Sequence, residues 1–281
     1  MILNLDPEFC PLPATKEIQF ESFTFAGGEP HIKISSDLSD ISEVHISHRL
    51  RSFNDIGLLL LATDALRRAG INSIKAILPY MPAARQDRLM IAGEPLSIKV
   101  VADLLNYCRF DSIRLFDVHS DVAPALLDNC DVTSNHLFVD QVVDALPPSL
   151  MLVSPDGGAL KKIGRLASHL KSYEVLACSK SRDVSTGALS GFEVPLENME
   201  GRDCLIVDDI CDGGGTFIGL AQELRKKNAG KLYLAVSHGI FSKGLDVLKE
   251  HFELIFSTDS FSTIDSDEQF KQIKLIAGQK L

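Results

Sequence analysis

The sequence lacks the cysteine patterns that would assign it to a disulfide scaffold or a zinc module. Its six cysteines stand at positions 10, 108, 130, 178, 204 and 211, and they include no CxxC pair and no zinc-site spacing. Disulfide frameworks belong mainly to secreted domains. We therefore expect reduced thiols in a cytoplasmic protein.

Long apolar runs and an excess of basic residues are also missing. The run from Leu58 to Ala62 is far shorter than the ~20 residues that a membrane-spanning helix needs. The opening MILNLDPEFC has no basic stretch of the kind that begins a signal peptide. The net charge is −10, and no basic stripe offers a surface for a phosphate backbone. We expect neither a membrane nor a nucleic-acid partner.

The 281 residues do contain a regular alternation of short apolar runs and helix-length amphipathic stretches. This alternation predicts α/β architecture, in which helices cover a mainly parallel sheet. It starts again at about residue 139, and the length suits two domains, so we divide the chain into residues 1–138 and 139–281. The expected strands are 74–78, 113–118, 150–155, 173–179, 204–209 and 232–237. Clear helices are expected within 52–70, 94–108 and 217–228.

A glycine-rich segment follows the expected strand 204–209 and reads VDDICDGGGT. A strand, a glycine turn and a helix N-terminus together present several backbone N–H groups to one point, which is typical of a phosphate site. It is not a Walker loop, because no GK[ST] follows. Asp208 and Asp209 can bind sugar hydroxyls or a metal-bound diphosphate. The alternative is that Asp212 caps the next helix and the glycines only form a tight turn.

A second segment, PYMPAARQDRLMIAGEPLS, carries Arg85 and Arg88 in an expected loop. Arginine offers paired donors to phosphate oxygens, so this cluster suits a nucleoside triphosphate. The alternative is a solvated run of charges.

Three further segments place polar residues directly after expected strands. His119 and Asp156 each follow a strand, and ligands gather at the carboxyl ends of strands in such sheets. Together these two residues can hold a divalent ion that also binds phosphate oxygens, although a single histidine is often structural. Lys180 and Arg182 precede small and polar residues that predict a mobile loop over a transferring phosphoryl group; the alternative is an exposed basic turn.

Taken in this order, the segments resemble the ribose-phosphate pyrophosphokinases, also called phosphoribosyl-pyrophosphate (PRPP) synthetases. The most specific parts are PYMPAARQDR, EPLSIKVVADLL, FDVHSD, VSPDGG and VDDICDGGGT, and the resemblance begins at about residue 23. It implies an α/β fold of two phosphoribosyltransferase-type domains, with the ATP side in 1–138 and the ribose-phosphate and catalytic loops in 139–281. It also implies Mg²⁺-dependent transfer of the β,γ-diphosphate of ATP to the C1 hydroxyl of ribose 5-phosphate, which gives PRPP and AMP. The family forms homo-oligomers that share ATP sites between subunits.

The resemblance further implies roles for single residues of this chain. ATP would be bound by Phe25 and Glu29, which reach a neighbouring subunit's nucleotide, and by Arg85, Gln86 and His119. Mg²⁺ would be held by His119 and Asp156, and catalysis would depend on Lys180 and Arg182. The ribose phosphate would be bound by Asp208, Asp209, Asp212, Gly213, Gly214, Gly215 and Thr216. Such transfer needs positioning and charge neutralisation, so no covalent nucleophile is assigned.

The chain departs from the family's pattern at several glycines, of which Gly213 bears on the substrate. The family usually has threonine there, and its loss removes a hydroxyl donor and widens the loop. Gly27, Gly93 and Gly239 also replace larger residues. If the remaining donors suffice, the acceptor is ribose 5-phosphate. If the extra room is used, the acceptor is a ribose whose 5-phosphate carries a further group, such as ADP-ribose, as in NAD salvage.

Two other functions remain open from the sequence. A phosphoribosyltransferase that consumes PRPP would explain VDDICDGGGT, but it has no need of the ARQDR and FDVHSD segments. A non-catalytic subunit of a synthetase would keep the fold, but it has no need of Lys180, Arg182 and His119.

Overall fold

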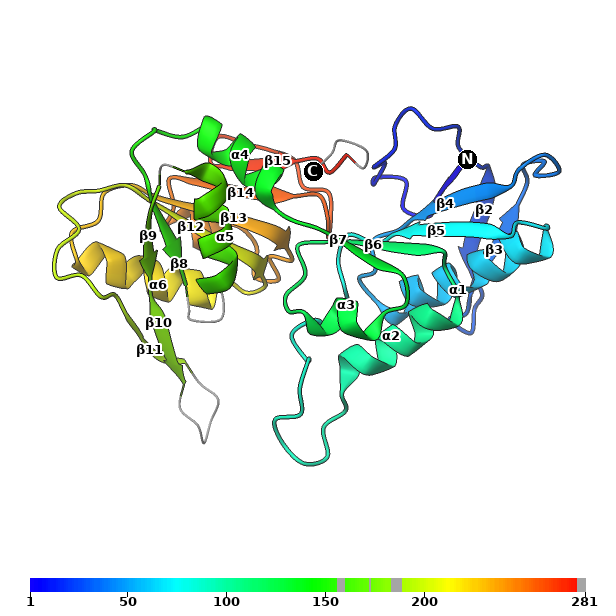
Figure 1. The fold of residues 1–281 in the computed structure, drawn as a ribbon, viewed down its shortest axis with the longest axis horizontal. Helices are drawn as coiled ribbons and strands as arrows, with labels where there is room; N and C mark the ends of the chain where they lie inside the picture. Colours follow the sequence, from blue (N-terminus) through cyan, green and yellow to red (C-terminus); the bar gives the residue numbers. More distant parts are fainter. Residues whose placement is uncertain (156–159, 172, 183–188, 277–281) are drawn as a thin grey trace. The chain divides into compact units, whose positions relative to one another are not determined.

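The computed structural model describes residues 1–155, 160–171, 173–182 and 189–276, without the side chains of residues 160, 161, 180–182, 189 and 190. The chain folds into two compact units (Figure 1). The first comprises Met1–Ser134, Ser260–Thr263 and Lys274–Leu281, and the second comprises Asn135–Asp259 and Ile264–Ile273. The units change at residues 134–135, and late segments return to the first unit, which a single division after residue 138 does not include.

The first unit is built on a five-stranded parallel sheet with the order β1-β4-β5-β6-β7. Its strands are β1 (Ile2–Asn4), β4 (Glu43–Ser47), β5 (Ser73–Ile77), β6 (Ser112–Phe116) and β7 (Cys130–Thr133). A separate antiparallel hairpin joins β2 (Phe20–Thr24) to β3 (Pro30–Ile34). Because the sheet is parallel, the carboxyl ends of its strands share one edge.

The helices of the first unit are α1 (Phe53–Arg68), α2 (Ser97–Tyr107) and α3 (Val122–Leu126), and Figure 1 shows α1 and α2 side by side below the sheet. Ser52 caps α1 by accepting a hydrogen bond from the N–H of Asp55. Pro95 lies before α2 and outside the helix, because the ψ of 79° at Leu96 is not helical. None of the helices in the described part of the chain has the length and hydropathy to cross a membrane.

The second unit has a six-stranded parallel sheet with the order β15-β14-β13-β12-β8-β9. The strands are β8 (Met151–Ser154), β9 (Glu174–Ala177), β12 (Cys204–Cys211), β13 (Leu232–Gly239), β14 (Leu254–Thr258) and β15 (Phe270–Ile273). A hairpin joins β10 (Ser179–Arg182) to β11 (Leu189–Glu193). The helices are α4 (His136–Asp144), α5 (Leu160–Leu170), α6 (Gly215–Lys226) and α7 (Asp246–Lys249). Both sheets confirm the predicted parallel α/β fold.

Each unit has its own hydrophobic core. In the first, Leu59 and Leu66 of α1 pack with sheet residues such as Ile46. In the second, Phe217 and Leu220 of α6 belong to the cluster that contains the apolar residues of β12 and β13. Every residue of β13 is buried, as expected for a central parallel strand covered on both faces. The cores therefore fix the loops at the strand ends, where the candidate site lies.

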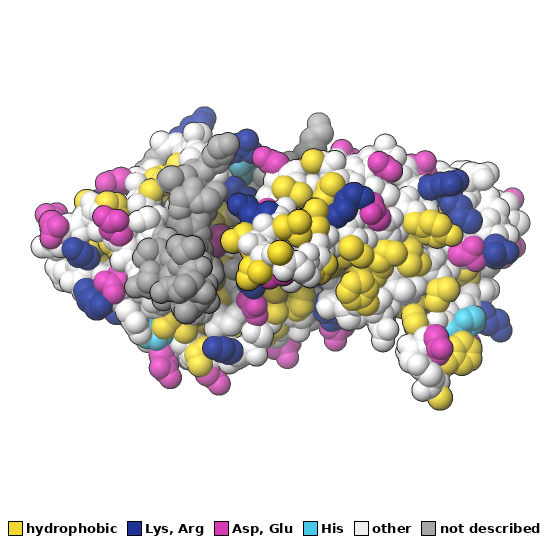
Figure 2. Space-filling model, turned by 90° about the horizontal axis from the view of Figure 1, so that it is seen from below, with side chains coloured by type: hydrophobic (Ala, Val, Ile, Leu, Met, Phe, Trp, Pro, Cys, Tyr) yellow, Lys and Arg dark blue, Asp and Glu magenta, His cyan; other side chains and the backbone are white. Residues whose placement is uncertain are grey.

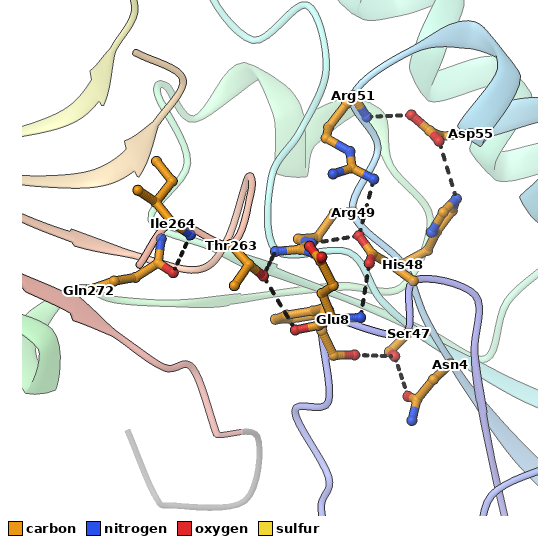
Figure 3. A network of polar contacts seen from close by, with 12 residues as sticks. Asn4, Glu8, Ser47, His48, Arg49, Arg51, Asp55, Thr263, Ile264 and Gln272 are labelled. Atoms are coloured by element: carbon orange, nitrogen blue, oxygen red, sulfur yellow. Dashed lines mark hydrogen bonds and ion pairs between the residues drawn. The ribbon is translucent and has the colours of Figure 1, made fainter. Parts of the chain in front are cut away.

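A buried ionic network anchors the returning segment within the first unit (Figure 3). The Arg49 side chain is fully buried, and its Nε donates to Oδ2 of Asp6 over 2.7 Å. One guanidinium nitrogen of Arg49 also donates to Oγ1 of Thr263 over 2.9 Å. Arg51 contacts the same Asp6 oxygen at 3.3 Å. The buried Arg49 guanidinium thus joins three segments that are distant in the sequence, around residues 6, 49 and 263.

Candidate active site

The glycine turn after β12, expected to be a phosphate site, has a geometry that depends mainly on Gly214. Gly214 has φ of +77°, and a Cβ there would lie 2.9 Å from Cδ2 of Leu248. Neither restriction applies to Gly213 or Gly215. Among the described residues, no side chain caps this end of α6, so its first N–H groups point out of the helix as donors. The expected strand, turn and helix order is confirmed.

Asp208 and Asp209 lie within β12 and differ in exposure. They were expected at the strand end, but β12 continues because Ile210 pairs with His238 and Cys211 pairs with Gly239. Side chains alternate between the faces of a strand: Asp208 is partly exposed, whereas Asp209 is 5% exposed. The N–H of Asp209 donates to Oδ1 of Asp208 over 2.9 Å. Asp208 is therefore the more accessible of the two carboxylates.

Lys162 of α5 is a partner of Asp209 that the sequence did not suggest. Its Nζ lies 3.5 Å from Oδ2 of Asp209, and its side chain is 35% exposed. A cation beside a buried carboxylate offsets part of the cost of burying its charge. The only sequence signal was the basic pair in ALKKIG, which is an ordinary pattern on a helix surface.

Asp212 does not cap α6, so the structural alternative for this residue is wrong. Its Oδ1 accepts a hydrogen bond of 2.7 Å from Oγ of Ser242, and its carbonyl accepts one of 3.2 Å from the Ser242 N–H. Ser242 belongs to the loop between β13 and α7. The site thus includes a second loop, residues 240–244, that the sequence analysis did not assign.

Two of the departing glycines have local structural reasons. A Cβ at Gly239 would lie 2.1 Å from the ring of Phe241, so a proline there would collide with that ring. Gly93 has φ of +95°, a conformation that side chains rarely adopt. At Gly27, a Cβ would meet only the flexible carboxylate of Glu29. Gly213 has no positive φ, and a Cβ there would make only ordinary contact, at 3.4 Å, with the Lys243 side chain.

In the first unit, the ARQD segment lies beside the end of β6. Arg85 and Gln86 are both exposed, and the N–H of Gln86 closes a turn onto the carbonyl of Ala83, whose φ is +58°. The N–H of Phe116 in β6 donates to the carbonyl of Pro79 over 3.0 Å. The residues before the ARQD turn are thereby tied to the strand that precedes His119.

Asp87 joins this segment to the loop that carries His119. Arg88 contacts Asp87 at 2.9 Å, and the Asp87 side chain is almost fully buried. The hydrogen bond from Arg88 lowers the pKa of Asp87, while burial opposes that change. A hydrogen bond from Ser120 and the charge of His119 lower this pKa further. The structure therefore brings two of the predicted ATP-side segments together at one edge of the sheet.

Apolar side chains are exposed immediately after the ARQD turn. Leu89, Met90 and Ile91 are 63%, 75% and 68% exposed, and apolar side chains are common on the face drawn in Figure 2. The segment thus presents both charged and apolar groups to solvent, a combination suited to a nucleotide with its phosphates and base.

Phe25 and Glu29 lie at the turn of the β2–β3 hairpin. The N–H of Phe25 donates to the carbonyl of Glu29 over 2.9 Å, and the half-exposed Phe25 ring packs edge-on against Phe23 at 4.9 Å. Within the described residues, neither Phe25 nor Glu29 has a polar or ring contact with Arg85, Gln86 or His119. The hairpin presents them to solvent.

The expected metal and catalytic groups are placed only in part. His119 is exposed just after β6, whereas Asp156 lies outside the described residues. The described residues contain no group of three or more His, Cys, Asp or Glu side chains able to hold a metal ion. Lys180 and Arg182 lie on β10, where Lys180 pairs with Phe192 and Arg182 with Leu189. Their side chains, and residues 183–188 of the expected mobile loop, lie outside the described residues.

Comparison with known proteins gives a consistent result. The model of the N-terminal domain of ribose phosphate pyrophosphokinase matches residues 11–108, and that of the phosphoribosyl transferase domain matches residues 139–267. The ribose-phosphate pyrophosphokinase of Mycoplasma genitalium is 34% identical over 78% of this chain and 66% of its own length. That of Maricaulis maris is 31% identical over 84% of this chain and 77% of its own. The chain thus spans about two thirds to three quarters of these relatives.

A solved structure shows the same fold. The phosphoribosylpyrophosphate synthetase from Mycobacterium smegmatis superposes with a TM-score of 0.84, covering 98% of this chain and 94% of the other at 24% identity. The matched domains and the curated relatives assign the chain to the ribose-phosphate pyrophosphokinase family.

Proposed function

We propose that the protein transfers the β,γ-diphosphate of ATP to the C1 hydroxyl of ribose 5-phosphate and so forms PRPP and AMP. The observation that carries this proposal is the turn at Gly214, which directs uncapped helix N–H groups outward a few residues after Asp208 and Asp209. An anion site beside two carboxylates suits a sugar that has both a phosphate and free hydroxyls. Family membership supports the same reaction.

The proposed roles follow from the chemistry of each group. The N–H groups of residues 213–216 and the Thr216 hydroxyl would bind the 5-phosphate, while Asp208 and Asp209 would accept hydrogen bonds from ribose hydroxyls. The C1 hydroxyl oxygen would attack the β-phosphorus, the bond between that phosphorus and the α–β bridging oxygen would break so that AMP leaves with that oxygen, and the proton of the C1 hydroxyl would pass to solvent. Lys180 and Arg182 would neutralise charge on the transferring group.

ATP would bind to the first unit at Arg85, Gln86 and His119, with Mg²⁺ held by His119, Asp156 and the phosphates. Mg²⁺ commonly uses one or two protein ligands and completes its shell with substrate phosphates and water. When bound, the ion would supply charge neutralisation at the phosphates.

We also propose that the protein self-associates. The carrying observation is the β2–β3 hairpin, which exposes Phe25 and Glu29 away from any polar or ring contact with the ARQD side chains of the same chain among the described residues. In a second copy these residues would reach the nucleotide. The mass measured by light scattering, with and without ATP, tests this proposal, and a monomer under both conditions would contradict it.

ADP-ribose is the second candidate acceptor, and Gly213 is the observation that favours it. A Cβ at this position would make only ordinary contact, at 3.4 Å, with Lys243. The fold therefore does not demand glycine at 213, and a wider loop can admit an acceptor whose 5-phosphate carries a further group. The product would be the C1 diphosphate of ADP-ribose.

An acceptor panel tests both candidates. The protein is incubated with ATP and Mg²⁺ and with either ribose 5-phosphate or ADP-ribose at matched concentrations, and AMP is quantified by chromatography. We expect AMP only when an acceptor is present. If no AMP forms with either acceptor, both reactions are ruled out. Lys180→Ala and Arg182→Ala are expected to lower kcat by at least about 100-fold without loss of ATP binding.

A further inference from the structure

The side chain of Lys243 lies over the glycine turn of the candidate phosphate site. A Cβ at Gly213 would be 3.4 Å from both Cδ and Cε of Lys243, and 3.6 Å from its Cγ. Three successive carbons of the lysine therefore pass beside this one glycine. Both residues belong to the second unit, so this proximity is a feature of one compact body.

The loop that carries Lys243 is fixed to the turn by backbone hydrogen bonds. The N–H groups of Ile240 and Phe241 donate to the carbonyl of Cys211 over 2.9 and 3.2 Å, and Ser242 binds Asp212 through its side chain and its N–H. The Phe241 side chain is buried and packs edge-on against Phe270 at 5.8 Å. These contacts hold the backbone of Lys243 beside residues 211–213.

The Lys243 side chain is exposed, and within the described residues its ammonium group has neither a hydrogen bond nor an ion pair. Other lysines of the same unit differ: Lys231 pairs with Glu253 at 2.9 Å, and Lys249 pairs with Asp267 at 2.6 Å. The nearby Asp212 carboxylate accepts a hydrogen bond from Ser242. A cation is thus held next to an anion-binding turn with its donors available to a ligand.

We propose that Lys243 binds the phosphate of the acceptor and that Gly213 is small because the lysine side chain occupies the adjacent space. The inference rests on the proposed function and adds a specificity residue to it. The ligand class is a ribose that carries one or two phosphates at C5. A lysine offers three donors and a full positive charge, whereas a threonine hydroxyl offers one neutral donor. A lysine in place of the threonine hydroxyl therefore favours a more highly charged or longer phosphate group.

The spacing makes this arrangement testable by a pair of substitutions. A threonine at 213 would place a hydroxyl and a methyl beyond a Cβ that already touches Lys243 at 3.4 Å, so the two side chains would compete for one space. If Lys243 is shortened, that space is free and the threonine hydroxyl can donate to the phosphate. The two positions should therefore show strong non-additivity.

The experiment measures KM for the acceptor and for ATP in the wild type and in Lys243→Ala, Lys243→Arg, Gly213→Thr and the double variant Gly213→Thr/Lys243→Ala. Lys243→Ala is expected to raise the acceptor KM about tenfold or more and to leave the ATP KM unchanged, because one charge-assisted contact is lost. Lys243→Arg should recover most of the affinity. Lys231→Ala is the matched control, since Lys231 is an exposed lysine just before the opposite end of β13.

The double variant tests whether residues 213 and 243 compete for one space, and the two acceptors show which phosphate Lys243 contacts. We expect the single substitution Gly213→Thr to weaken acceptor binding. In the double variant Gly213→Thr/Lys243→Ala, we expect ribose 5-phosphate to bind more strongly than in Lys243→Ala. A larger loss with ADP-ribose than with ribose 5-phosphate in Lys243→Ala would show that the lysine contacts the second phosphate, and the reverse would place it on the 5-phosphate. An acceptor KM within twofold of the wild type in Lys243→Ala would overturn the inference.

A direct binding measurement separates this inference from the proposed reaction. Ribose 5-phosphate and ADP-ribose are titrated into the wild type and Lys243→Ala by calorimetry without ATP. If the wild type makes no AMP, the proposed reaction is wrong, yet weaker binding to Lys243→Ala would still support Lys243 as a phosphate ligand. Equal binding to both proteins would overturn the inference whatever the activity.

Discussion

The three glycines after Asp212 are not equivalent. Gly214 has φ of +77°, and it lies too close to Leu248 for a side chain to fit. Gly215 begins α6 and would accommodate a Cβ without any contact within 4 Å. Gly213 is intermediate, because the three atoms nearest to a Cβ there all belong to Lys243, at 3.4 to 3.6 Å. One glycine is thus required by the backbone, whereas another lies beside the Lys243 side chain.

Gly214→Ala should therefore destabilise the second unit. The left-handed conformation costs a non-glycine residue about 1–2 kcal/mol, and the contact with Leu248 adds to this. The urea midpoint, followed by circular dichroism, measures the effect. Gly215→Ala serves as the control and should leave the midpoint unchanged. Equal midpoints for the two variants would show that the turn is not constrained as described.

Lys162 is expected to position Asp209 rather than to contact the substrate. Its ammonium group lies 3.5 Å from the Asp209 carboxylate, which is almost entirely buried. Lys162→Met should raise the acceptor KM several-fold without changing the ATP KM, because the buried Asp209 carboxylate would lose this cationic neighbour and could shift its position. Lys162→Arg should restore the acceptor KM. A changed ATP KM, or no rescue by arginine, would contradict a positioning role.

Among the elements, the network around Arg49 connects the ends of β1 and β4 to the returning segment 260–263. The guanidinium is fully buried and binds Asp6 and Thr263, so these segments can pack only if its charge is paired. Removing one partner of such a pair leaves a charge without compensation. The network therefore makes the fold of the first unit depend on a segment late in the chain.

Arg49→Met should destabilise the first unit by about 3 kcal/mol or more, because the Asp6 carboxylate would keep only the partly exposed Arg51 as a cationic partner. Chemical denaturation measures this loss. Arg68→Met is the matched control, since Arg68 forms an exposed ion pair with Asp64 within α1, and it should leave the midpoint nearly unchanged. Similar midpoints for the two variants would contradict a structural role for the buried pair.

The same network predicts that acid destabilises the first unit. Burial lowers the pKa of His48 despite the negative charges of Asp55 and Asp6, so the unfolded chain binds a proton that the folded chain does not as pH falls below about 6.5. Burial opposes ionisation of Asp6, but Arg49 and Arg51 outweigh it and lower its pKa. Stability from Asp6 is therefore present above about pH 4 and lost below it.

Urea midpoints measured from pH 8 to pH 3 test this expectation. The midpoint should fall in two stages, and His48→Phe should reduce the first stage while Asp6→Asn should reduce the second. A midpoint that is constant over this range, or a decline that neither substitution alters, would contradict the assignment of these two groups.

The sequence predicted the elements whose signals are local. The apolar runs of β5, β6, β8, β9, β12 and β13 and the capped periodicity of α1 reappear in the structure with shifts of a few residues at their ends. The return of residues 260–263 to the first unit could not be predicted, because it depends on the burial of Arg49, and arginine is rarely buried. Lys243 was missed for a related reason, since a single exposed lysine carries no pattern.

For the molecule as a whole, the proposed binding groups are divided between two units, each with its own parallel sheet and core. The groups assigned to ATP belong mainly to the first unit, and those assigned to the ribose phosphate belong to the second. This division follows the two matched domains, residues 11–108 and 139–267.

Identifying the products of one reaction mixture is the most direct test of diphosphate transfer. ATP, Mg²⁺ and ribose 5-phosphate or ADP-ribose are incubated with the protein and followed by ³¹P NMR, which distinguishes AMP from ADP and detects a diphosphate bonded to C1. We expect AMP and the C1 diphosphate in equal amounts with at least one acceptor. Formation of ADP together with an acceptor that has gained a single phosphate would contradict diphosphate transfer by this protein. The absence of AMP with both acceptors would contradict it as well.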